Sequence, residues 1–591
     1  MRLKLVTMAA AVALGGCTAR TGQQGVGTDV AGAPVEVKII AFNDFHGNLM
    51  PPKRSIDLPL AGGGSAAVPA GGAAYFASAV AQLKAENPNN VVVSAGDMIG
   101  ASPLVSSLFL DEPTILAMNL IGVDFNAVGN HEFDRGSGEL LRMRHGGCEK
   151  FTVRQPCRVD PGFNGAKFDF LAANTVRDSG GTLFPAYGIK TFGSGRNQVK
   201  VAFIGMTLEA TPSVVTPAGV AGLSFRDEAD TANALIPKLK AEGADAIVIV
   251  IHEGAVSKKS YNDKDCSGLS GDLLPILDRL DAEVDVVVSG HTHNAYVCDY
   301  AQINPAKPFL VTSAGQYGTM LTDIRLTIGG GEVRAKLADN VIVQGEGYTG
   351  SRGEVAPVAS VQRFEPNPAV AQLVHRYQQA AAPVEAEPVG KLSGSALRER
   401  NEAGESVLGN LIADAQLAAT ASPAGGGAQI AFMNTGGIRA DLLPGAGGVV
   451  TFGQAYAVQP FGNSMTVKTM TGRQLKALLE QQFNSGSNSV ESPNILQVSN
   501  GFSYAYDLSK PAGERIREMT LNGSPVRDEA SYRVAMSNFL SSGGDNFTVF
   551  RDGTDAVGGL QDIEVLAAYL SGAETRAVPT LGRIRNVTPK P

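Results

Sequence analysis

The chain has 591 residues, more than one hydrophobic core usually supports, so we expect at least two domains. Its hydrophobic content of 44% and charged content of 18% are those of an ordinary soluble protein. The formal net charge of -8 provides no broad basic field, so a nucleic-acid polymer is not expected as a partner. A small anionic ligand is compatible with this charge, because bound metal ions can outweigh it locally.

The chain opens on a segment typical of exported proteins. Two basic residues precede an apolar run over residues 5–14, which is too short to span a membrane and matches a secretory signal. The run ends in Leu-Gly-Gly-Cys, which resembles the cleavage box of bacterial lipoproteins. We therefore expect a signal peptide over residues 1–17, with Cys17 as the lipidated residue. The alternative is a plain signal peptide that carries a cysteine there by chance.

Residues 18–34 are rich in glycine and threonine, which predicts a tether. The protein is thus expected to be exported, to the periplasm or to the outer membrane or cell surface as a lipoprotein. It is expected to touch a membrane only through its lipid anchor. The sequence carries no indication of the oligomeric state.

Four further cysteines agree with export, since an even number outside a reducing compartment predicts two disulfides. Three pairings are possible, and closeness in sequence favours Cys148 with Cys157, which leaves Cys266 with Cys298. The alternative is a zinc site, but the paired Cys-x-x-Cys spacing of such sites is missing.

The first half alternates helical segments with short apolar runs that end in polar residues. Five of these runs are predicted strands, over residues 35–42, 91–94, 125–128, 246–251 and 286–289. Near-continuous apolar strands indicate a sheet covered on both faces, and in such sheets ligands bind outside the carboxyl ends of the strands. All five runs are therefore expected to bring their polar residues to one rim.

The pattern lapses over residues 345–368 into glycine, proline, serine and charge, which predicts a linker, and a helix over residues 368–381 follows. We expect a first domain over residues 35–344, a linker and connecting helix over 345–388, and a second domain over 389–587. The second domain is expected to contain helices over residues 409–420 and 472–483 and strands over 429–433 and 532–536.

The chain has only seven histidines, and five of them directly follow the predicted strands. These five are His46, His131, His252, His291 and His293. Asp44, Asp97 and Asn130 lie at the same strand ends. A lone histidine is more often a hydrogen-bonded structural residue than a ligand, but five at equivalent strand ends make that alternative poor.

These residue types are the donors that two divalent cations need. A bridging carboxylate holds such cations roughly 3.5–4 Å apart, where they stabilise both the attacking and the leaving oxygen of a displacement at phosphorus. A hydroxide shared by the two cations is nucleophilic near neutral pH. A nucleophilic side chain is then unnecessary, and no nucleophile-elbow signature is apparent in the sequence.

Five ordered motifs between residues 44 and 293 resemble those of the calcineurin-like metallophosphoesterases. They are Asp-x-His, Gly-Asp, Gly-Asn-His-Glu, His and Gly-His-x-His. Longer strings resemble the 5′-nucleotidase family, namely Asn-Asp-Phe-His-Gly-Asn from residue 43, Gly-Asp-Met-Ile-Gly-Ala-Ser-Pro from residue 96 and Gly-Asn-His-Glu-Phe-Asp from residue 129. The resemblance implies an α/β protein of two domains, an N-terminal αββα sandwich and a C-terminal α/β nucleotide-recognition domain.

The resemblance also implies two sets of metal ligands that share Asp97. One set is Asp44, His46, Asp97 and His293, and the other is Asp97, Asn130, His252 and His291. Closely studied members of the family often carry glutamine or asparagine where this chain has His293. The additional imidazole favours zinc, manganese or cobalt over magnesium.

His131 and Asp134 match the catalytic pair of the family. The resemblance implies that His131 meets the charge that develops on the phosphoryl or leaving oxygen, while Asp134 holds the imidazole protonated and oriented. A neighbouring carboxylate raises the pKa of a histidine, which suits this role. The alternative is that Asp134 only caps the following turn.

Strings in the second half resemble the nucleotidase C-terminal domain and its substrate-binding segments. The substrate residues that they imply are Asn434, Gly437, Arg439, Phe461, Phe539 and Asp545. Phe461 and Phe539 are expected to sandwich a base, although most phenylalanines simply pack in a core. Arg398 lies where the family often has a substrate-contacting arginine, and Arg400 is a substitute for a second arginine whose expected position holds Glu402.

Together these residues predict a metal-dependent phosphoric ester hydrolase that cleaves nucleoside 5′-monophosphates by attack of a dinuclear metal-bound hydroxide. Other nucleotides and nucleotide sugars are expected as further substrates. A 2′,3′-cyclic-nucleotide phosphodiesterase with 3′-nucleotidase action is the alternative within the same two-domain plan. A thiosulfohydrolase is disfavoured by the base-stacking phenylalanines. A surface lipoprotein that binds nucleotides without turnover is the alternative outside enzymes.

Overall fold

The computed structural model describes residues 33–589, except residues 61, 153, 216 and 351–352. The expected signal peptide, the tether and Cys17 therefore lie outside the described residues. Within the described part, no helix is both long and apolar enough to cross a membrane.

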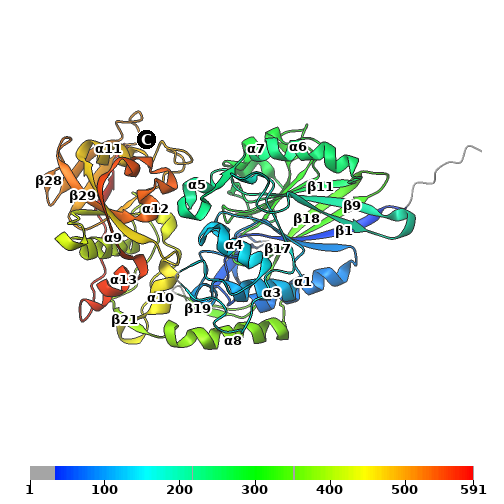
Figure 1. Cartoon of the computed structure of the whole chain (residues 1–591), viewed down its shortest axis with the longest axis horizontal. Helices are drawn as coiled ribbons and strands as arrows, with labels where there is room; N and C mark the ends of the chain where they lie inside the picture. The colour runs from blue at the N-terminus through cyan, green and yellow to red at the C-terminus, as the bar shows by residue number, and fades with distance from the viewer. Residues whose placement is uncertain (1–32, 61, 153, 216, 351–352, 590–591) are drawn as a thin grey trace, which may run out of the picture.

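Two six-stranded sheets form the centre of the N-terminal domain (Figure 1). The first has the order β18 (Val333–Ile342), β17 (Met320–Ile328), β1 (Val35–Phe42), β4 (Asn90–Ser94), β5 (Phe125–Ala127) and β6 (Asp169–Leu171). The second has the order β15 (Ala295–Asp299), β16 (Leu310–Ala314), β14 (Val286–Ser289), β11 (Ala246–Ile251), β9 (Val199–Met206) and β8 (Tyr187–Phe192). Strands β1, β4, β5 and β6 are mutually parallel, as are β9, β11, β14 and β16.

All five predicted strands are present, but they belong to two sheets rather than to one. Three belong to the first sheet and two to the second. Alternate residues of β1 show why the sequence did not distinguish these arrangements: Val37 and Ile39 pack between the sheets, while Ile40 packs under the outer helices. A continuous apolar strand indicates that both faces are covered, and either a helix or a second sheet can cover them.

Helices complete four layers. The first sheet is covered by α1 (Ala73–Glu86), α3 (Glu112–Ile121) and α8 (Pro368–Glu385), and the second by α6 (Glu228–Ala241) and α7 (Leu273–Arg279). The predicted connecting helix is α8, and five of its residues are buried in the N-terminal core. This helix runs along the N-terminal domain toward the second domain (Figure 1). The αββα sandwich that the sequence predicted is confirmed.

Both expected cysteine pairs are disulfide-bonded. Cys148 joins Cys157, and Cys266 joins Cys298. The second pair ties the short 3-10 helix that begins at Cys266 to strand β15.

The C-terminal domain is a second α/β unit, as expected. Its larger sheet has the order β25 (Gln497–Val498), β22 (Ile430–Met433), β29 (Ser531–Ser537), β24 (Ser464–Thr471) and β30 (Thr554–Gln561). One face packs on α9 (Val407–Thr420), α10 (Phe452–Val458) and α13 (Asp562–Ser571). The other packs on α11 (Gly472–Glu480) and on the smaller sheet of β28 (Ser524–Pro525), β27 (Ile516–Leu521), β26 (Phe502–Tyr506) and β31 (Ile584–Asn586).

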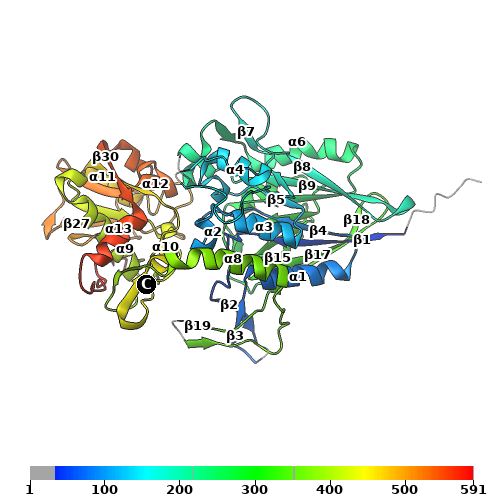
Figure 2. The same ribbon diagram turned by 60° about the horizontal axis from the view of Figure 1, so that its bottom comes forward.

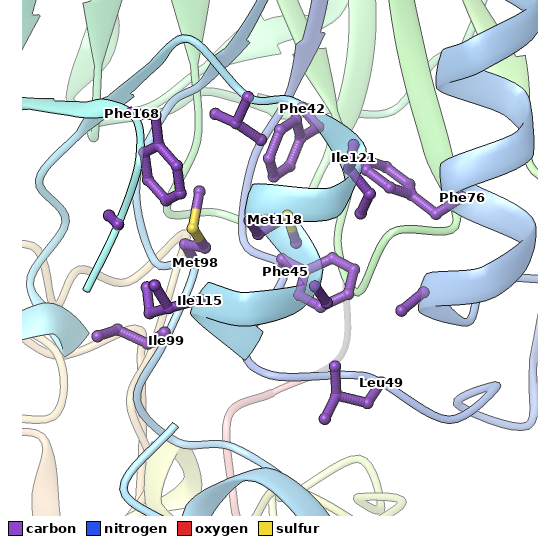
Figure 3. Packing of buried hydrophobic residues seen from close by; sticks show 14 of the residues in the cluster. Phe42, Phe45, Leu49, Phe76, Met98, Ile99, Ile115, Met118, Ile121 and Phe168 are labelled. Carbon is purple, nitrogen blue, oxygen red and sulfur yellow. The ribbon is translucent and has the colours of Figure 1, made fainter. Parts of the chain in front are cut away.

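The loops after β1 and β4 are anchored in the core by apolar residues that alternate with polar ones. Phe45 lies between Asp44 and His46 and is fully buried, and Met98, directly after Asp97, is fully buried as well. Figure 3 shows both side chains in one apolar cluster under the loops. Burying such side chains contributes about 1.5–3 kcal/mol each, so the polar neighbours are held in place by core packing.

The two domains meet on the side where these loops lie. Leu104 of α2 (Leu104–Ser107) is buried in a cluster whose other buried residues belong to the C-terminal domain, and Leu108 packs against the same cluster. The guanidinium of Arg154 lies 5.7 Å from the ring centre of Tyr456 in the other domain. The view in Figure 2 shows α2 and α8 beside α10 of the second domain. The strand ends with the predicted ligands therefore face the C-terminal domain.

Candidate active site

Asp44, His46 and His293 converge on one point at the ends of the strands. The Nε2 atoms of His46 and His293 are 3.1 Å apart, and the Oδ1 atom of Asp44 lies 3.3 Å from His293 Nε2. His46 donates its Nδ1–H to the carbonyl oxygen of Gly100 at 2.9 Å, so its Nε2 presents a lone pair to this point. These three residues can hold one metal ion.

Asp97, His252 and His291 form an adjacent group of the same kind. His252 donates its Nδ1–H to the carbonyl oxygen of Ala95 at 2.7 Å, and its Nε2 lies 3.0 Å from Asp97 Oδ2. The Oδ1 atom of Asn130 is 3.1 Å from both His252 Nε2 and His291 Nδ1. Four predicted ligands thus surround a second point.

Asp97 links the two groups. Its Oδ2 atom lies 3.0 Å from His252 Nε2 and 3.6 Å from His46 Nε2, while its Oδ1 accepts the backbone N–H of His131 at 2.9 Å. One carboxylate oxygen is therefore near imidazole nitrogens of both groups. The structure brings together all seven predicted ligands, and this contact matches the bridging role predicted for Asp97.

The arrangement fits bound cations, because hydrogen-bond acceptors face one another without donors between them. The lone pair of His252 Nε2 points at the oxygens of Asp97 and Asn130. The buried Oδ1 atom of Asp44 has no hydrogen-bond partner among the described residues. Converging acceptors repel one another unless a positive ion lies among them, since an isolated buried acceptor is costly. Divalent ions bound here would be ligated by these nitrogen and oxygen lone pairs.

Five of the seven residues are held in the left-handed region of backbone conformation. Their φ angles lie between +47° and +66°, at Asp44, His46, Asp97, His291 and His293. A non-glycine residue in this region costs of order 1–3 kcal/mol and persists only where the surrounding structure imposes it. Gly96 has a φ of +86°, and a Cβ atom there would lie 2.6 Å from His252 Nδ1. These unfavourable backbone conformations lower the stability of the fold, but they direct the five side chains toward common points.

Burial keeps His291 and His293 neutral, whereas burial of His252 is outweighed by Asp97, which raises the pKa of His252 to about 10. Burial lowers the pKa of His291 to about 3 and that of His293 to about 4, and His252 further lowers the former. Burial acts to raise the pKa of Asp97, but His252 and His131 hold it well below its ordinary value. Neutral imidazole and ionised carboxylate are the forms that bind metal ions.

His131 and Asp134 are paired as predicted. The Nδ1 atom of His131 lies 2.9 Å from Asp134 Oδ2, which orients the ring and leaves Nε2 for a ligand. Burial lowers the pKa of His131, but Asp134 and Asp97 raise it above its ordinary value overall. The ring also stacks on Phe461 of the C-terminal domain, with centres 5.7 Å apart and planes at 23°.

Glu132 supports the two ligand loops, a role that no pattern in the sequence indicated. This buried carboxylate accepts the backbone N–H groups of Asp97, Met98 and Gly129, each at 2.9 Å. It therefore fixes the loops after β4 and β5 against each other. Only its place in the Gly-Asn-His-Glu string marked this residue in the sequence.

A cavity of about 290 Å³ lies between the cluster and the C-terminal domain. On the cluster side it is lined by Asn130, His131, Asp134 and His291, and on the other side by residues that include Asn434, Gly437, Arg439, Phe461, Phe539 and Asp545. Asp545 accepts a hydrogen bond of 2.6 Å from the Nδ2 group of Asn434. Six predicted substrate residues thus share one cavity with the predicted catalytic pair.

Arg398 and Arg400 lie elsewhere, in the wall of a second cavity of about 750 Å³. His293 and Arg439 also line it, so it too reaches the cluster, and it shares Gly436 and Arg439 with the first cavity. Arg398 donates to the carbonyl oxygen of Arg439 at 3.1 Å. Arg54 and Tyr317 also line this cavity, and no sequence motif pointed to them. The predicted substrate residues therefore fall into two cavities that both reach the cluster and have Arg439 in common.

Comparisons with known proteins match both halves of the chain. The sequence profile of the calcineurin-like phosphoesterases matches residues 37–295, and that of the 5′-nucleotidase C-terminal domain matches residues 388–552. The chain belongs to the two-domain 5′-nucleotidase family. Members of this family are metal-dependent phosphoester hydrolases by their first domain, and this chain retains every predicted ligand and the His131–Asp134 pair.

Relatives with curated names cover most of the chain. It is 30% identical to Endonuclease YhcR of Bacillus subtilis over 93% of its own length, but it spans only 41% of YhcR. It is also 30% identical to Cell wall protein Lmo0130 of Listeria monocytogenes, over 89% of this chain and 66% of that protein. Among solved structures, the 5′-nucleotidase precursor of Thermus thermophilus has a TM-score of 0.71 at 26% identity, over 94% of this chain and all of that one.

Proposed function

We propose that this protein hydrolyses nucleoside 5′-monophosphates to nucleoside and inorganic phosphate. The observation that carries the proposal is the 290 Å³ cavity, in which His131 and His291 of the metal cluster face Phe461, Phe539 and Asp545. Aromatic rings bind bases of any kind by stacking, while ionised carboxylates accept hydrogen bonds from ribose hydroxyls. A nucleotide is the ligand class that uses all of these groups together.

Each side chain has a role in this proposal. Asp44, His46, Asp97 and His293 hold one divalent ion, and Asp97, Asn130, His252 and His291 hold the other. When bound, the two ions supply an activated water and neutralise charge on the phosphate. His131 holds its proton at Nε2 toward the departing oxygen, and Asp134 keeps the ring in this orientation. Arg439 offers a planar pair of donors to phosphate oxygens, and the two phenylalanines position the base.

The test is phosphate release from a substrate panel, with and without chelator. The panel contains 5′-, 3′- and 2′,3′-cyclic nucleotides, an oligonucleotide and a thiosulfate ester. We expect the highest kcat/KM with 5′-monophosphates, loss of turnover with chelator, and recovery on addition of zinc, manganese or cobalt. Elemental analysis of the purified protein would identify the resident metals, for which the extra imidazole of His293 favours these three over magnesium.

Each alternative has its own outcome in this panel. Cyclic nucleotides cleaved much faster than 5′-monophosphates would favour the 2′,3′-cyclic phosphodiesterase with 3′-nucleotidase action. Cleavage of the oligonucleotide would indicate a nuclease activity, like the one in the name of Endonuclease YhcR. Turnover of the thiosulfate ester alone would favour a thiosulfohydrolase. Saturable nucleotide binding without release of phosphate in the presence of any of the metals would favour a nucleotide-binding lipoprotein.

We also infer that the protein is exported and anchored by a lipid on Cys17. Two disulfides and the cell-wall name of the relative Lmo0130 support export. Fractionation of cells that express Cys17→Ala tests the anchor, because this variant is expected in the soluble exported fraction and the wild type in the membrane fraction. An unchanged distribution contradicts lipidation.

A further inference from the structure

The cavity of about 290 Å³, here called the base cavity, has a buried acid in its wall that the functional argument so far leaves unused. Asp562 lines this cavity together with Phe461 and Phe539, and only 3% of its surface is exposed. It is the first residue of helix α13 and follows directly after strand β30. Its Oδ1 atom accepts the backbone N–H of Ile563 at 2.8 Å. No sequence motif pointed to this residue.

Hydrogen bonds in both directions join Asp562 to Asn463, which also lines the base cavity. The backbone N–H of Asn463 donates to Asp562 Oδ2 at 3.2 Å, and the backbone N–H of Asp562 donates to the carbonyl oxygen of Asn463 at 2.8 Å. The side chain of Asn463 also hydrogen-bonds the carboxylate and thereby lowers the pKa of Asp562. Asn463 directly precedes β24, whose Ser464 pairs with Gln561 of β30, so the sheet brings the two residues together.

Asn463 lies where the segments of the two stacking phenylalanines meet. It follows Phe461 by two residues, and the backbone N–H of the next residue, Ser464, donates to Oδ1 of Asn538 at 3.1 Å. Asn538 directly precedes Phe539 at the start of α12 (Asn538–Ser541). A base between two aromatic rings has both faces covered, so it is recognised by hydrogen bonds to its edge. Asn463 is therefore placed to contact the edge of a base that Phe461 and Phe539 hold.

The carboxylate decides which end of the Asn463 amide is free for a ligand. Burial raises the pKa of Asp562 to about 7, although the hydrogen bonds from Ile563 and Asn463 act in the opposite direction. Above this pH the carboxylate is ionised and can only accept, so it pairs with Nδ2 and leaves Oδ1 free. The Oε1 atom of Gln459, in the wall of the same cavity, is buried without a hydrogen-bond partner among the described residues. The wall therefore offers acceptors, which match a ligand edge that donates.

We propose that Asp562 is a positioning residue that orients the amide of Asn463 and thereby makes the protein selective for bases with an exocyclic amino group. The inference rests on the proposed function, which places the base between Phe461 and Phe539. Adenine and cytosine carry an amino donor where hypoxanthine and uracil carry an oxo acceptor. An oxo group opposite Oδ1 of Asn463 brings two acceptors together, so the base loses a hydrogen bond that it makes in water. The discrimination comes from binding and adds no covalent step.

The experiment measures kcat/KM at about pH 8.5, where Asp562 is ionised, for two substrate pairs that differ in this group, AMP with IMP and CMP with UMP. Wild type is expected to prefer the amino member of each pair by about 10-fold, as a lost hydrogen bond and an unpaired acceptor imply. Asp562→Asn is expected to bring both ratios to within about twofold of one, because an amide donates as well as accepts and no longer fixes Asn463. Wild-type ratios near one, or ratios that Asp562→Asn leaves unchanged, overturn the proposal.

Glu564→Gln is the matched control. It removes an exposed carboxylate from the same turn of α13, outside the base cavity, and its glutamine can still accept the backbone N–H of Gln561. We expect both substrate ratios to equal those of wild type. A decrease as large as that in Asp562→Asn would show that the ratios follow the charge at the start of this helix, which contradicts the proposal.

A double-mutant cycle separates positioning from a general structural role. Asn463→Ala removes the amide and is expected to bring both ratios close to one. In that background Asp562→Asn is expected to cause no further change in the ratios, because Asp562 acts through Asn463. A further change contradicts the proposal. If Asp562→Asn loses its cooperative thermal transition, Asp562→Ser takes its place with the same expected ratios, since serine keeps an oxygen that caps the helix and also donates.

Binding of nucleosides separates failure of this inference from failure of the proposed function. Adenosine and inosine are titrated calorimetrically into chelator-treated wild type and Asp562→Asn at the same pH. Adenosine is expected to bind wild type about 10-fold more tightly than inosine, and the variant within about twofold. If no nucleotide is hydrolysed but this pattern holds, the proposed function is wrong and the selectivity for amino groups stands. If AMP is hydrolysed and both nucleosides bind wild type equally, the role of Asp562 is wrong.

Discussion

Asp97 is the residue on which the two predicted metal sites depend together. One of its oxygens lies near imidazoles of both groups, and the other accepts the N–H of His131. Its loop is held by Glu132 from below and by the core packing of Met98. The side chain is thus fixed by contacts on every side, which is the preorganisation that metal sites need.

Replacing Asp97 with Asn is expected to remove the bridge and to lower metal content from two ions per chain toward one or none. Activity is expected to decrease by at least about 100-fold, since even supporting residues of metal sites contribute 10–100-fold. Elemental analysis and phosphate release measure the two effects. The control is His145→Gln, which changes a histidine outside the cluster. Full metal content in Asp97→Asn would contradict the bridging role.

Asp134 tests the catalytic pair without touching a proposed ligand. Asp134→Asn removes the charge that faces His131 Nδ1 at 2.9 Å and that helps to raise the pKa of this histidine. We expect kcat to decrease by about 10²–10⁴-fold while metal content and KM change little, because only proton transfer to the leaving group is impaired. Steady-state kinetics measure this. An unchanged kcat would reduce Asp134 to a capping residue.

At the scale of single elements, helix α6 contains a buried acid at its first residue. Burial raises the pKa of Glu228 to about 7, although the backbone N–H of Glu209 donates to it at 2.6 Å and acts in the opposite direction. The folded protein therefore retains a proton that the unfolded chain releases between about pH 4.5 and 7. Stability from this group decreases as the pH rises through that window.

Glu228→Gln is expected to abolish this penalty. The melting temperature of the variant relative to wild type should rise between pH 5 and pH 8. The corresponding gain in the free energy of unfolding has an upper limit of roughly 3 kcal/mol for a pKa shift of this size. The matched control is Asp230→Asn, an exposed carboxylate of the same helix turn, whose effect should be equal at both pH values. Differential scanning calorimetry measures both. A pH-independent difference for Glu228→Gln contradicts the expectation.

At the scale of the whole molecule, α8 belongs structurally to the N-terminal domain. Val370, Leu373, Val374 and Tyr377 of this helix are buried in the cluster that also contains Phe42. The sequence placed this helix in a connecting segment, since its position after a linker-like stretch carries no information about which core receives its apolar face. The helix therefore contributes to the first core and carries the chain to the second.

Two truncations test this role. A chain that ends at residue 344 is expected to lack a cooperative thermal transition, because it loses several buried side chains worth about 1.5–3 kcal/mol each. A chain that ends at residue 387 is expected to fold, bind metal and hydrolyse p-nitrophenyl phosphate. Its kcat/KM for AMP should be lower by about 100-fold or more, since the stacking residues are missing. Equal stability of the two truncations contradicts the assignment of α8.

Much of the candidate site could be predicted from the sequence, because many of its residues are neighbours in the chain. Asp44 and His46, or Asn130 and His131, are neighbours in the chain, and each pair follows an apolar run whose strand character is itself local. The disulfide pairs were equally accessible from residue type and closeness in sequence. Family resemblance then supplied the roles of these residues.

Other features depend on contacts between residues far apart in the chain. The division of the five strands between two sheets, the burial of α8 and the placement of Arg54 beside Tyr317 have no local signal. Arg54 is an ordinary charged residue until the fold brings it to the cavity of Arg398 and Arg439. Local chemistry in the sequence therefore determined the metal cluster, while only the tertiary structure decided which charges surround it, because electrostatic effects depend on distance in space.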